Sequence, residues 1–343
     1  MLTRTLLLAG IFSCTVNLLG AQQRWAPAID SILAVKQIRA FNGVVLIAKD
    51  GKVQYEKSIG YADREKKRQL DMDSRFIIMS VTKQITAVMV LQEAEKGRIQ
   101  LQQTLRTYLP DFPDRWADTI TVHQLLNHTS GVVWYDQPLA FTPGSRYAYS
   151  NFGYALLKQV LEKVTGQPYR ALASILFKKC GMSHSGVAGQ LPAIQGYAYS
   201  EKVPGEILTP KDTIPDFLLA GAGVVSTAGD LLRWNQHLHG GKLLRDSSYQ
   251  AMITAWQHRD HSILGRMGAG YGVLLTDDKK EIGHTGYMSQ LGFTTINLYF
   301  PATRTSMIVL ENVAWKESDL PHGFSFEKDI LSLISPVAKE NHR

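Results

Sequence analysis

The sequence is poor in cysteine, with Cys14 and Cys180 as the only two in 343 residues. If the N-terminal segment that carries Cys14 is removed, Cys180 stands alone and no internal disulfide is possible. Cys180 follows an apolar, helix-like stretch and has no local pattern that would stabilise a thiolate. We therefore interpret it as a structural residue rather than a nucleophile.

Beyond its N-terminus the chain lacks any apolar run near the ~20 residues that span a bilayer. The N-terminus has Arg4, an apolar run over 6–12 and a small-residue site at Gly20-Ala21. This pattern predicts a signal peptide over residues 1–21, and therefore export to the periplasm or secretion. Alternatively, residues 11–14 are similar to a lipoprotein box, in which Cys14 would be lipid-modified.

Several chemical signatures are also missing. The sequence has no Gly-x-Ser-x-Gly elbow, no His-Glu-x-x-His motif, and only Gly268-Ala269-Gly270 before a strand where a dinucleotide loop would precede a helix. We interpret His237, His239 and the histidines of 258–261 as helix-surface residues, and expect neither metal nor cofactor. The net charge of +7 is scattered, and its densest basic run, 64–68, is typical of a solvated loop. No nucleic-acid partner is expected.

The pattern of the remaining sequence predicts an α+β fold. Residues 44–48 and 53–60 flank an Asp50-Gly51 turn and predict a hairpin, after a first amphipathic helix that spans residues 29–38. Helical segments follow over 82–96, 154–164 and 230–239, each ending at a glycine. Strands return at 271–275, 293–300 and 306–310, before a closing helix at 324–334.

These elements predict one domain over 22–343, with an α/β part (25–75 and 255–343) and an inserted all-helical part (76–254). The N-terminal hairpin would join the C-terminal strands in an antiparallel sheet that the two terminal helices flank. We expect a cleft between the sheet and the helical part to hold the functional site.

Ser80 and Lys83 lie three residues apart at the start of a predicted helix, which places hydroxyl and amine on one face. A serine becomes nucleophilic when a neighbour takes its proton, and a buried lysine can do so if its pKa is lowered. The same spacing recurs at Ser325 and Lys328, without companion motifs, so we interpret that pair as surface decoration.

Two further motifs follow Ser80 in the chain. Tyr149-Ser150-Asn151 is the only Tyr-x-Asn of the sequence, and His284-Thr285-Gly286 stands between two predicted strands. With Ser80-x-x-Lys83 they resemble the serine β-lactamase and penicillin-binding protein family, in its class C β-lactamase and D-Ala-D-Ala carboxypeptidase branch. The stretches 125–131, 143–144 and 221–227 are also similar to this family. The resemblance covers most of residues 40 to 312 and implies a β-lactamase/transpeptidase-like fold.

The resemblance implies a role for each matching residue. Ser80 would form an acyl-enzyme, Lys83 would accept or relay its proton, and Tyr149 would protonate the leaving group and later activate water. Asn151 would hold Lys83 and the substrate amide. Substrate would lie along His284, Thr285 and Gly286, and the backbone N–H groups of Ser80 and Tyr287 would form the oxyanion hole.

One departure matters, because His284 stands where class C β-lactamases have lysine. A mostly neutral histidine would hold a substrate carboxylate less firmly. The expected reaction is β-lactamase-like or D-Ala-D-Ala carboxypeptidase-like amide hydrolysis of a small molecule or peptidoglycan peptide. Two alternatives stay open: an ester hydrolase that uses the same residues, and a sensor that penicillin acylates without turnover. Tyr149 could instead be an ordinary loop aromatic, and His284 could cap a hairpin.

Overall fold

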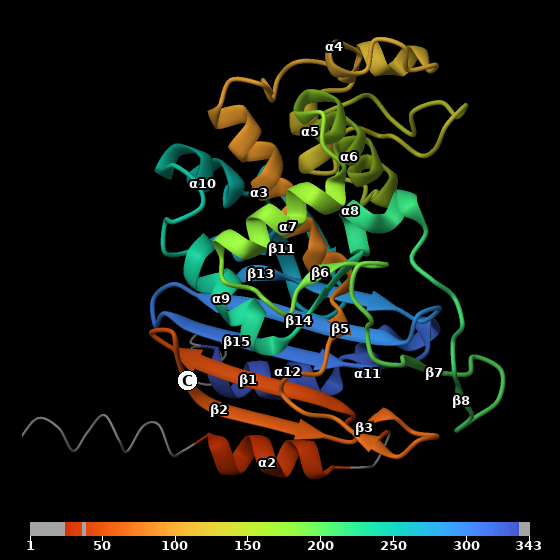
Figure 1. Cartoon of the computed structure of the whole chain (residues 1–343), viewed down its shortest axis with the longest axis vertical. Coiled ribbons are helices and arrows are strands. Elements are labelled where there is room, and N and C mark those ends of the chain that lie inside the picture. Colours follow the sequence, from red (N-terminus) through yellow and green to blue (C-terminus); the bar gives the residue numbers. More distant parts are fainter. Residues whose placement is uncertain (1–24, 36–38, 336–343) are drawn as a thin grey trace, which may run out of the picture.

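The computed structural model describes residues 25–35 and 39–335. Its centre is an eight-stranded antiparallel sheet in the order β10-β11-β12-β13-β14-β15-β1-β2 (Figure 1). The N-terminal hairpin therefore pairs with the last long strands of the chain, as the sequence predicts. The strands of this sheet are β1 (Gly43–Lys49), β2 (Lys52–Ile59), β10 (Gln257–His261), β11 (Gly265–Ala269), β12 (Leu274–Leu275), β13 (Ile282–Met288), β14 (Phe293–Phe300) and β15 (Thr305–Glu311).

Strand β1 is buried on both faces because the sheet is covered on both sides. Val45 and Ile47 face one hydrophobic cluster with α2 (Ala26–Ala34) and α12 (Ser325–Ile334), whereas Val44 and Leu46 face the larger cluster of the helical part. The predicted first helix ends at Ala34, and residues 36–38 of that prediction lie outside the described residues. Within the described ranges, every helix is too short or too polar to cross a membrane.

The middle of the chain is helical, as expected, but also contains short strands. They form small sheets, β5-β9-β6 and, with β16 (Val313–Ala314), β16-β7-β8, while β3 (Tyr61–Asp63) pairs with β4 (Arg68–Gln69). These short strands are β5 (Phe76–Ile77), β6 (Gly186–Val187), β7 (Tyr197–Tyr199), β8 (Ile207–Leu208) and β9 (Val224–Ser226). The helices are α3 (Thr82–Glu95), α4 (Leu105–Tyr108), α5 (Val122–Leu126), α6 (Asn151–Thr165), α7 (Tyr169–Lys179), α8 (Leu219–Ala222), α9 (Ala228–Leu238), α10 (Asp246–Met252) and α11 (Leu320–Gly323). Short 3-10 turns are η1 (Met79–Val81), η2 (Arg115–Asp118), η3 (Asp216–Leu218) and η4 (Glu317–Asp319).

Helix α3 runs through the centre of the helical part and buries residues on all its sides, so it holds its first turn rigidly. Helix α6 begins three residues before its predicted start because the Ser150 hydroxyl caps it by accepting from Gly153 N. It ends at Gly166, which adopts φ 67°. The starts of α3 and α6 thereby bring the first two sequence motifs together.

One prediction about the C-terminal part is wrong, and the structure also excludes one alternative. Residues 258–261 belong to strand β10, not to a helix surface, and His261 is buried. In this strand Arg259 and His261 face inward while His258 and Asp260 face solvent. Because polar residues occupy both faces, the alternation of apolar and polar residues that indicates a strand is missing. Strand β11, which pairs with β10, includes Gly268 and Ala269. His284 lies within β13, so it does not cap a hairpin turn.

Candidate active site

Ser80 lies in η1, directly before α3, and its hydroxyl has two close partners. Lys83 Nζ is 3.2 Å from Ser80 Oγ, and the Tyr149 hydroxyl donates to the same oxygen at 2.6 Å. Met79, just before Ser80, has a φ of 48°, which is rare for a residue with a side chain. The structure thus brings serine, lysine and tyrosine together from two distant segments.

Lys83 is fully buried, and burial lowers its pKa well below 10.5 because a charged amine loses its hydration. Its amine also lies 2.7 Å from Asn151 Oδ1 and 2.8 Å from the carbonyl oxygen of Gly221. A neutral amine has two N–H groups and one lone pair. Since the two oxygens can only accept, they take both N–H groups, and the lone pair is left to face Ser80 Oγ.

Tyr149 is held from both sides. His128, buried beneath it, stacks at 4.5 Å between ring centroids, and its Nδ1 accepts from Ser150 N at 3.1 Å. Lys83 Nζ lies 4.7 Å from the Tyr149 ring centroid on the catalytic side. Although the Tyr149 residue is 36% exposed, its hydroxyl points inward to Ser80, and burial of that hydroxyl raises the pKa above 10. The phenol therefore keeps its proton at neutral pH.

Strand β13 places the third motif against the segment that precedes Ser80. A Cβ added to Gly286 would lie 2.7 Å from both Ile78 O and Met79 Cβ, so only glycine allows this approach. The Tyr287 hydroxyl donates to the carbonyl oxygen of Trp315. Strand β12 pairs with β13 only at Ile282 and Gly283.

His284 is uncharged in this setting. Burial lowers the pKa of His284 to about 3, because a charged imidazole would lose its hydration. Its Nδ1 lies 2.5 Å from Thr285 O, and since a carbonyl only accepts, Nδ1 carries the proton. His284 thus brings no positive charge to the place where class C β-lactamases have a lysine.

A cation that the sequence motifs did not indicate lies above the site. The guanidinium of Arg259, on β10, is 5.5 Å from the Tyr149 ring centroid and 5.4 Å from that of Tyr147. It also donates to the Tyr147 hydroxyl at 3.1 Å. Arg259 escaped prediction because β10 was not recognised as a strand, whereas Gly221 and His128 lie within stretches that resembled the family but had no assigned role.

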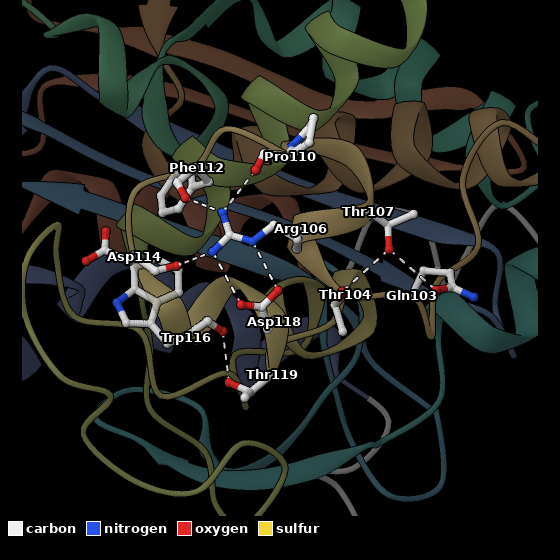
Figure 2. A network of polar contacts seen from close by, with 10 residues as sticks. All are labelled: Gln103, Thr104, Arg106, Thr107, Pro110, Phe112, Asp114, Trp116, Asp118 and Thr119. Carbon is white, nitrogen blue, oxygen red and sulfur yellow. Dashed lines mark hydrogen bonds and ion pairs between the residues drawn. The ribbon is translucent and has the colours of Figure 1, made fainter.

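The loop of residues 131–148, which leads to Tyr149, is held by a polar network around Arg106, which Figure 2 shows. The Arg106 guanidinium donates to the carbonyl oxygens of Pro110, Phe112 and Asp114 and pairs with Asp118. From this network, Asp114 Oδ1 accepts from the backbone N–H of residue 136 at 3.1 Å, and Trp116 Nε1 donates to the carbonyl of residue 137 at 3.1 Å.

Other candidate groups lie apart from this centre. Among the described residues, no three His, Cys, Asp or Glu side chains are grouped as a metal site requires. Cys180 is buried at the end of α7, and burial raises the pKa of its thiol to about 11, which disfavours the thiolate. Ser325 and Lys328 lie on α12, on the opposite side of the sheet.

Known proteins are similar to this chain in sequence and in fold. The family model described as Beta-lactamase matches residues 30–326. The chain belongs to the beta-lactamase family. PbpX of Bacillus subtilis strain 168, which carries the name of a penicillin-binding protein, is 29% identical over 293 residues, covering 80% of this chain and 71% of PbpX. Esterase EstB of Burkholderia gladioli is 30% identical over 219 residues, covering 52% of this chain and 56% of EstB.

Solved structures match this beta-lactamase-family chain over nearly its whole length. A penicillin-binding protein from Bacillus halodurans superposes with a TM-score of 0.75 at 24% identity, covering 90% of this chain and 99% of that one. D-amino acid amidase from Ochrobactrum anthropi SV3 gives a TM-score of 0.75 at 22% identity, covering 92% and 99%. The predicted family and the α+β, β-lactamase/transpeptidase-like fold are thereby confirmed. The chain is a serine hydrolase of the acyl-enzyme type.

Proposed function

We propose that this serine hydrolase cleaves an amide bond in a β-lactam or in a peptide of the D-Ala-D-Ala kind, with Ser80, Lys83 and Tyr149 as catalytic residues. The observation that carries the proposal is the arrangement around Lys83. Asn151 Oδ1 and Gly221 O accept from its amine, and Ser80 Oγ lies 3.2 Å away, in the direction left to the lone pair of the neutral amine. The names of PbpX and of D-amino acid amidase support an amide substrate. We also propose that the protein acts after export, either free or lipid-tethered.

In the proposed acylation, Ser80 Oγ bonds to the substrate carbonyl carbon while its proton passes to Lys83 Nζ. The backbone N–H groups of Ser80 and Tyr287 receive the negative charge that develops on the carbonyl oxygen. The C–N bond then breaks, and the leaving nitrogen takes the Tyr149 proton. The acyl-enzyme is left with a lysine ammonium beside a tyrosine phenolate, two charges that stabilise each other.

Deacylation reverses these proton positions. Water attacks the acyl carbon and gives a proton to the Tyr149 phenolate, and the Lys83 ammonium returns a proton to Ser80 Oγ as the ester bond breaks. All three side chains regain their starting state. The raised pKa of Tyr149 suits this order, because the phenol begins as a proton donor and its phenolate is then a strong base.

Tyr149→Phe should separate amide from ester substrates. An amine leaving group needs a proton, whereas p-nitrophenolate leaves without one, so hydrolysis of a D-Ala-D-Ala peptide should fall by about 10²- to 10⁴-fold. Release of p-nitrophenol during acylation should fall far less, as stopped-flow measurement of the first turnover would show. Equal losses of acylation rate for both substrates would contradict the assigned role of Tyr149.

Arg259 supports a substrate that carries a carboxylate. β-Lactams and peptides that end in D-Ala both have this group near the scissile bond. Because His284 is neutral, the positive charge available to a substrate carboxylate is the guanidinium of Arg259, which lies over the Tyr149 ring. Arginine binds carboxylates through a planar pair of N–H donors, a geometry that lysine does not offer.

Arg259→Gln should therefore raise KM for nitrocefin and for a D-Ala-D-Ala peptide by about 10- to 100-fold, the range expected for one charged hydrogen bond. The KM for p-nitrophenyl acetate, which has no carboxylate, should stay within about twofold. Arg266→Gln is the matched control, because Arg266 lies exposed on the paired strand β11, opposite Asp260. If Arg259→Gln changes all three KM values alike, carboxylate recognition is not its role.

A carboxylic-ester substrate is the second candidate. The similarity to EstB and the neutral His284 favour it, because a neutral ester does not need a cation in the third motif. A panel of nitrocefin, a D-Ala-D-Ala peptide and p-nitrophenyl acetate on the purified protein ranks the candidates by kcat/KM. Intact mass after penicillin treatment tests the sensor alternative, since a sensor keeps its acyl adduct and a hydrolase clears it.

A further inference from the structure

His261, the last residue of β10, joins this strand to the third motif. Its side chain is buried, and its Nε2 lies 2.9 Å from the Thr285 hydroxyl oxygen. Its other ring nitrogen, Nδ1, lies 3.2 Å from the backbone nitrogens of both Ile263 and Leu264. One imidazole therefore bridges the turn after β10 and the strand beside Ser80.

These contacts fix the tautomer of His261. The backbone N–H groups of Ile263 and Leu264 both donate to Nδ1, so this nitrogen must be the unprotonated one. The single proton of the neutral ring then sits on Nε2. Burial, followed by the charge of Arg259, lowers the pKa of His261 to about 4, so the ring is neutral at physiological pH. Nε2–H consequently donates to Thr285 Oγ1.

This contact uses one lone pair of the Thr285 hydroxyl and leaves its hydrogen free. Its oxygen accepts from His261, and its own hydrogen must point to another acceptor. Within the described part of the chain, His261 is the only residue with a hydrogen bond to Thr285 Oγ1. Thr285 precedes Gly286, which packs on the segment before Ser80, and the β13 edge next to it is not paired with β12.

The geometry points to His261 as a positioning residue that makes the Thr285 hydroxyl a hydrogen-bond donor toward a substrate oxygen. This inference rests on the proposed function. A hydroxyl whose hydrogen is free to donate matches a carboxylate, whose oxygens only accept. Arg259 faces the same side of β10, two residues earlier, so strand β10 would contribute both to the charge and to the hydrogen-bond direction of this subsite.

A double-mutant cycle tests this coupling. Thr285→Val removes the hydroxyl and keeps the shape of the side chain. His261→Asn keeps an oxygen that can accept from the turn amides but is too short to donate to Thr285. We expect His261→Asn to raise KM for a D-Ala-D-Ala peptide by about 3- to 10-fold, as for one neutral hydrogen bond, with little change in kcat. In the Thr285→Val background it should change KM by less than about twofold.

Two further measurements make the result decisive. His261→Gln carries an amide donor at nearly the reach of Nε2 and should restore much of the lost affinity. The preference for the free-acid peptide over its C-terminal carboxamide should fall in His261→Asn and in Thr285→Val. If His261→Asn lowers affinity equally with and without the Thr285 hydroxyl, it acts through the turn and the inference is wrong. If the wild-type protein hydrolyses no probe, the proposed function itself fails.

Discussion

Replacing Ser80 by alanine should abolish turnover of every substrate that the wild-type protein accepts. The variant lacks the serine oxygen that attacks the carbonyl, and among the described residues no other hydroxyl is hydrogen-bonded to Lys83 Nζ. Losing such a nucleophile costs about 10⁶-fold in a serine hydrolase whose residues act as a unit. The fold should persist, because the substitution removes one atom from a partly exposed residue.

The chain provides its own control for this experiment. Ser325 has the same spacing to a lysine, but lies on α12 behind the sheet. Ser325→Ala should keep full activity, and after penicillin treatment it should still gain the acyl mass that Ser80→Ala lacks. An acyl adduct on Ser80→Ala, or wild-type rates from it, would place the nucleophile elsewhere.

Replacing Lys83 by methionine should lower kcat by about 10²- to 10⁴-fold for esters and amides alike, because Ser80 loses the base that takes its proton. Activity of the wild-type protein should fall as pH falls through the lowered pKa of Lys83, since protonation occupies the lone pair. Rate profiles over pH give this acid limb directly. Lys328→Met, on exposed α12, is the control, and its profile should match that of the wild type.

The same substitution should change how stability depends on pH. The pKa of Lys83 is lower in the folded protein than in the unfolded chain, so between these two values the unfolded chain binds more protons. The free energy of unfolding of the wild type therefore rises with pH in this window, up to about 10.5. Lys83→Met lacks this gain, so its stability relative to the wild type should fall as pH rises from the lowered pKa of Lys83 toward about 10.5. Urea unfolding across this range that shows a constant difference would mean that the folded-state pKa is not lowered.

The sequence predicted the parts of the site that depend on local spacing. Ser80 and Lys83 are spaced to share one helix face, and the turn residues that delimit strands and helices can be identified from the amino-acid sequence alone. The family motifs then placed Tyr149, Asn151 and His284 in the same neighbourhood, and the structure brings Ser80, Lys83, Tyr149 and Asn151 into direct contact.

Contacts between segments that are distant in the chain could not be predicted in this way. Gly221 meets Lys83 through a backbone carbonyl, which any residue type could supply, so no side chain marks its role. Arg259 and His261 lie on a strand of charged and polar residues, whose composition conceals its period. The lowered pKa of Lys83 depends on its complete burial, which arises only when the sheet and the helical part pack together.

The ring of contacts around Arg106 has a consequence for substrate entry. The Arg106 side chain donates to the carbonyls of three alternate residues, Pro110, Phe112 and Asp114 (Figure 2). Asp114 and Trp116 in turn hold the loop before Tyr149 at residues 136 and 137. A loop that is ordered before any ligand arrives loses little conformational entropy when one binds. Less of the binding free energy is then spent on ordering it. The loop that leads to Tyr149 should therefore need little further ordering when substrate binds.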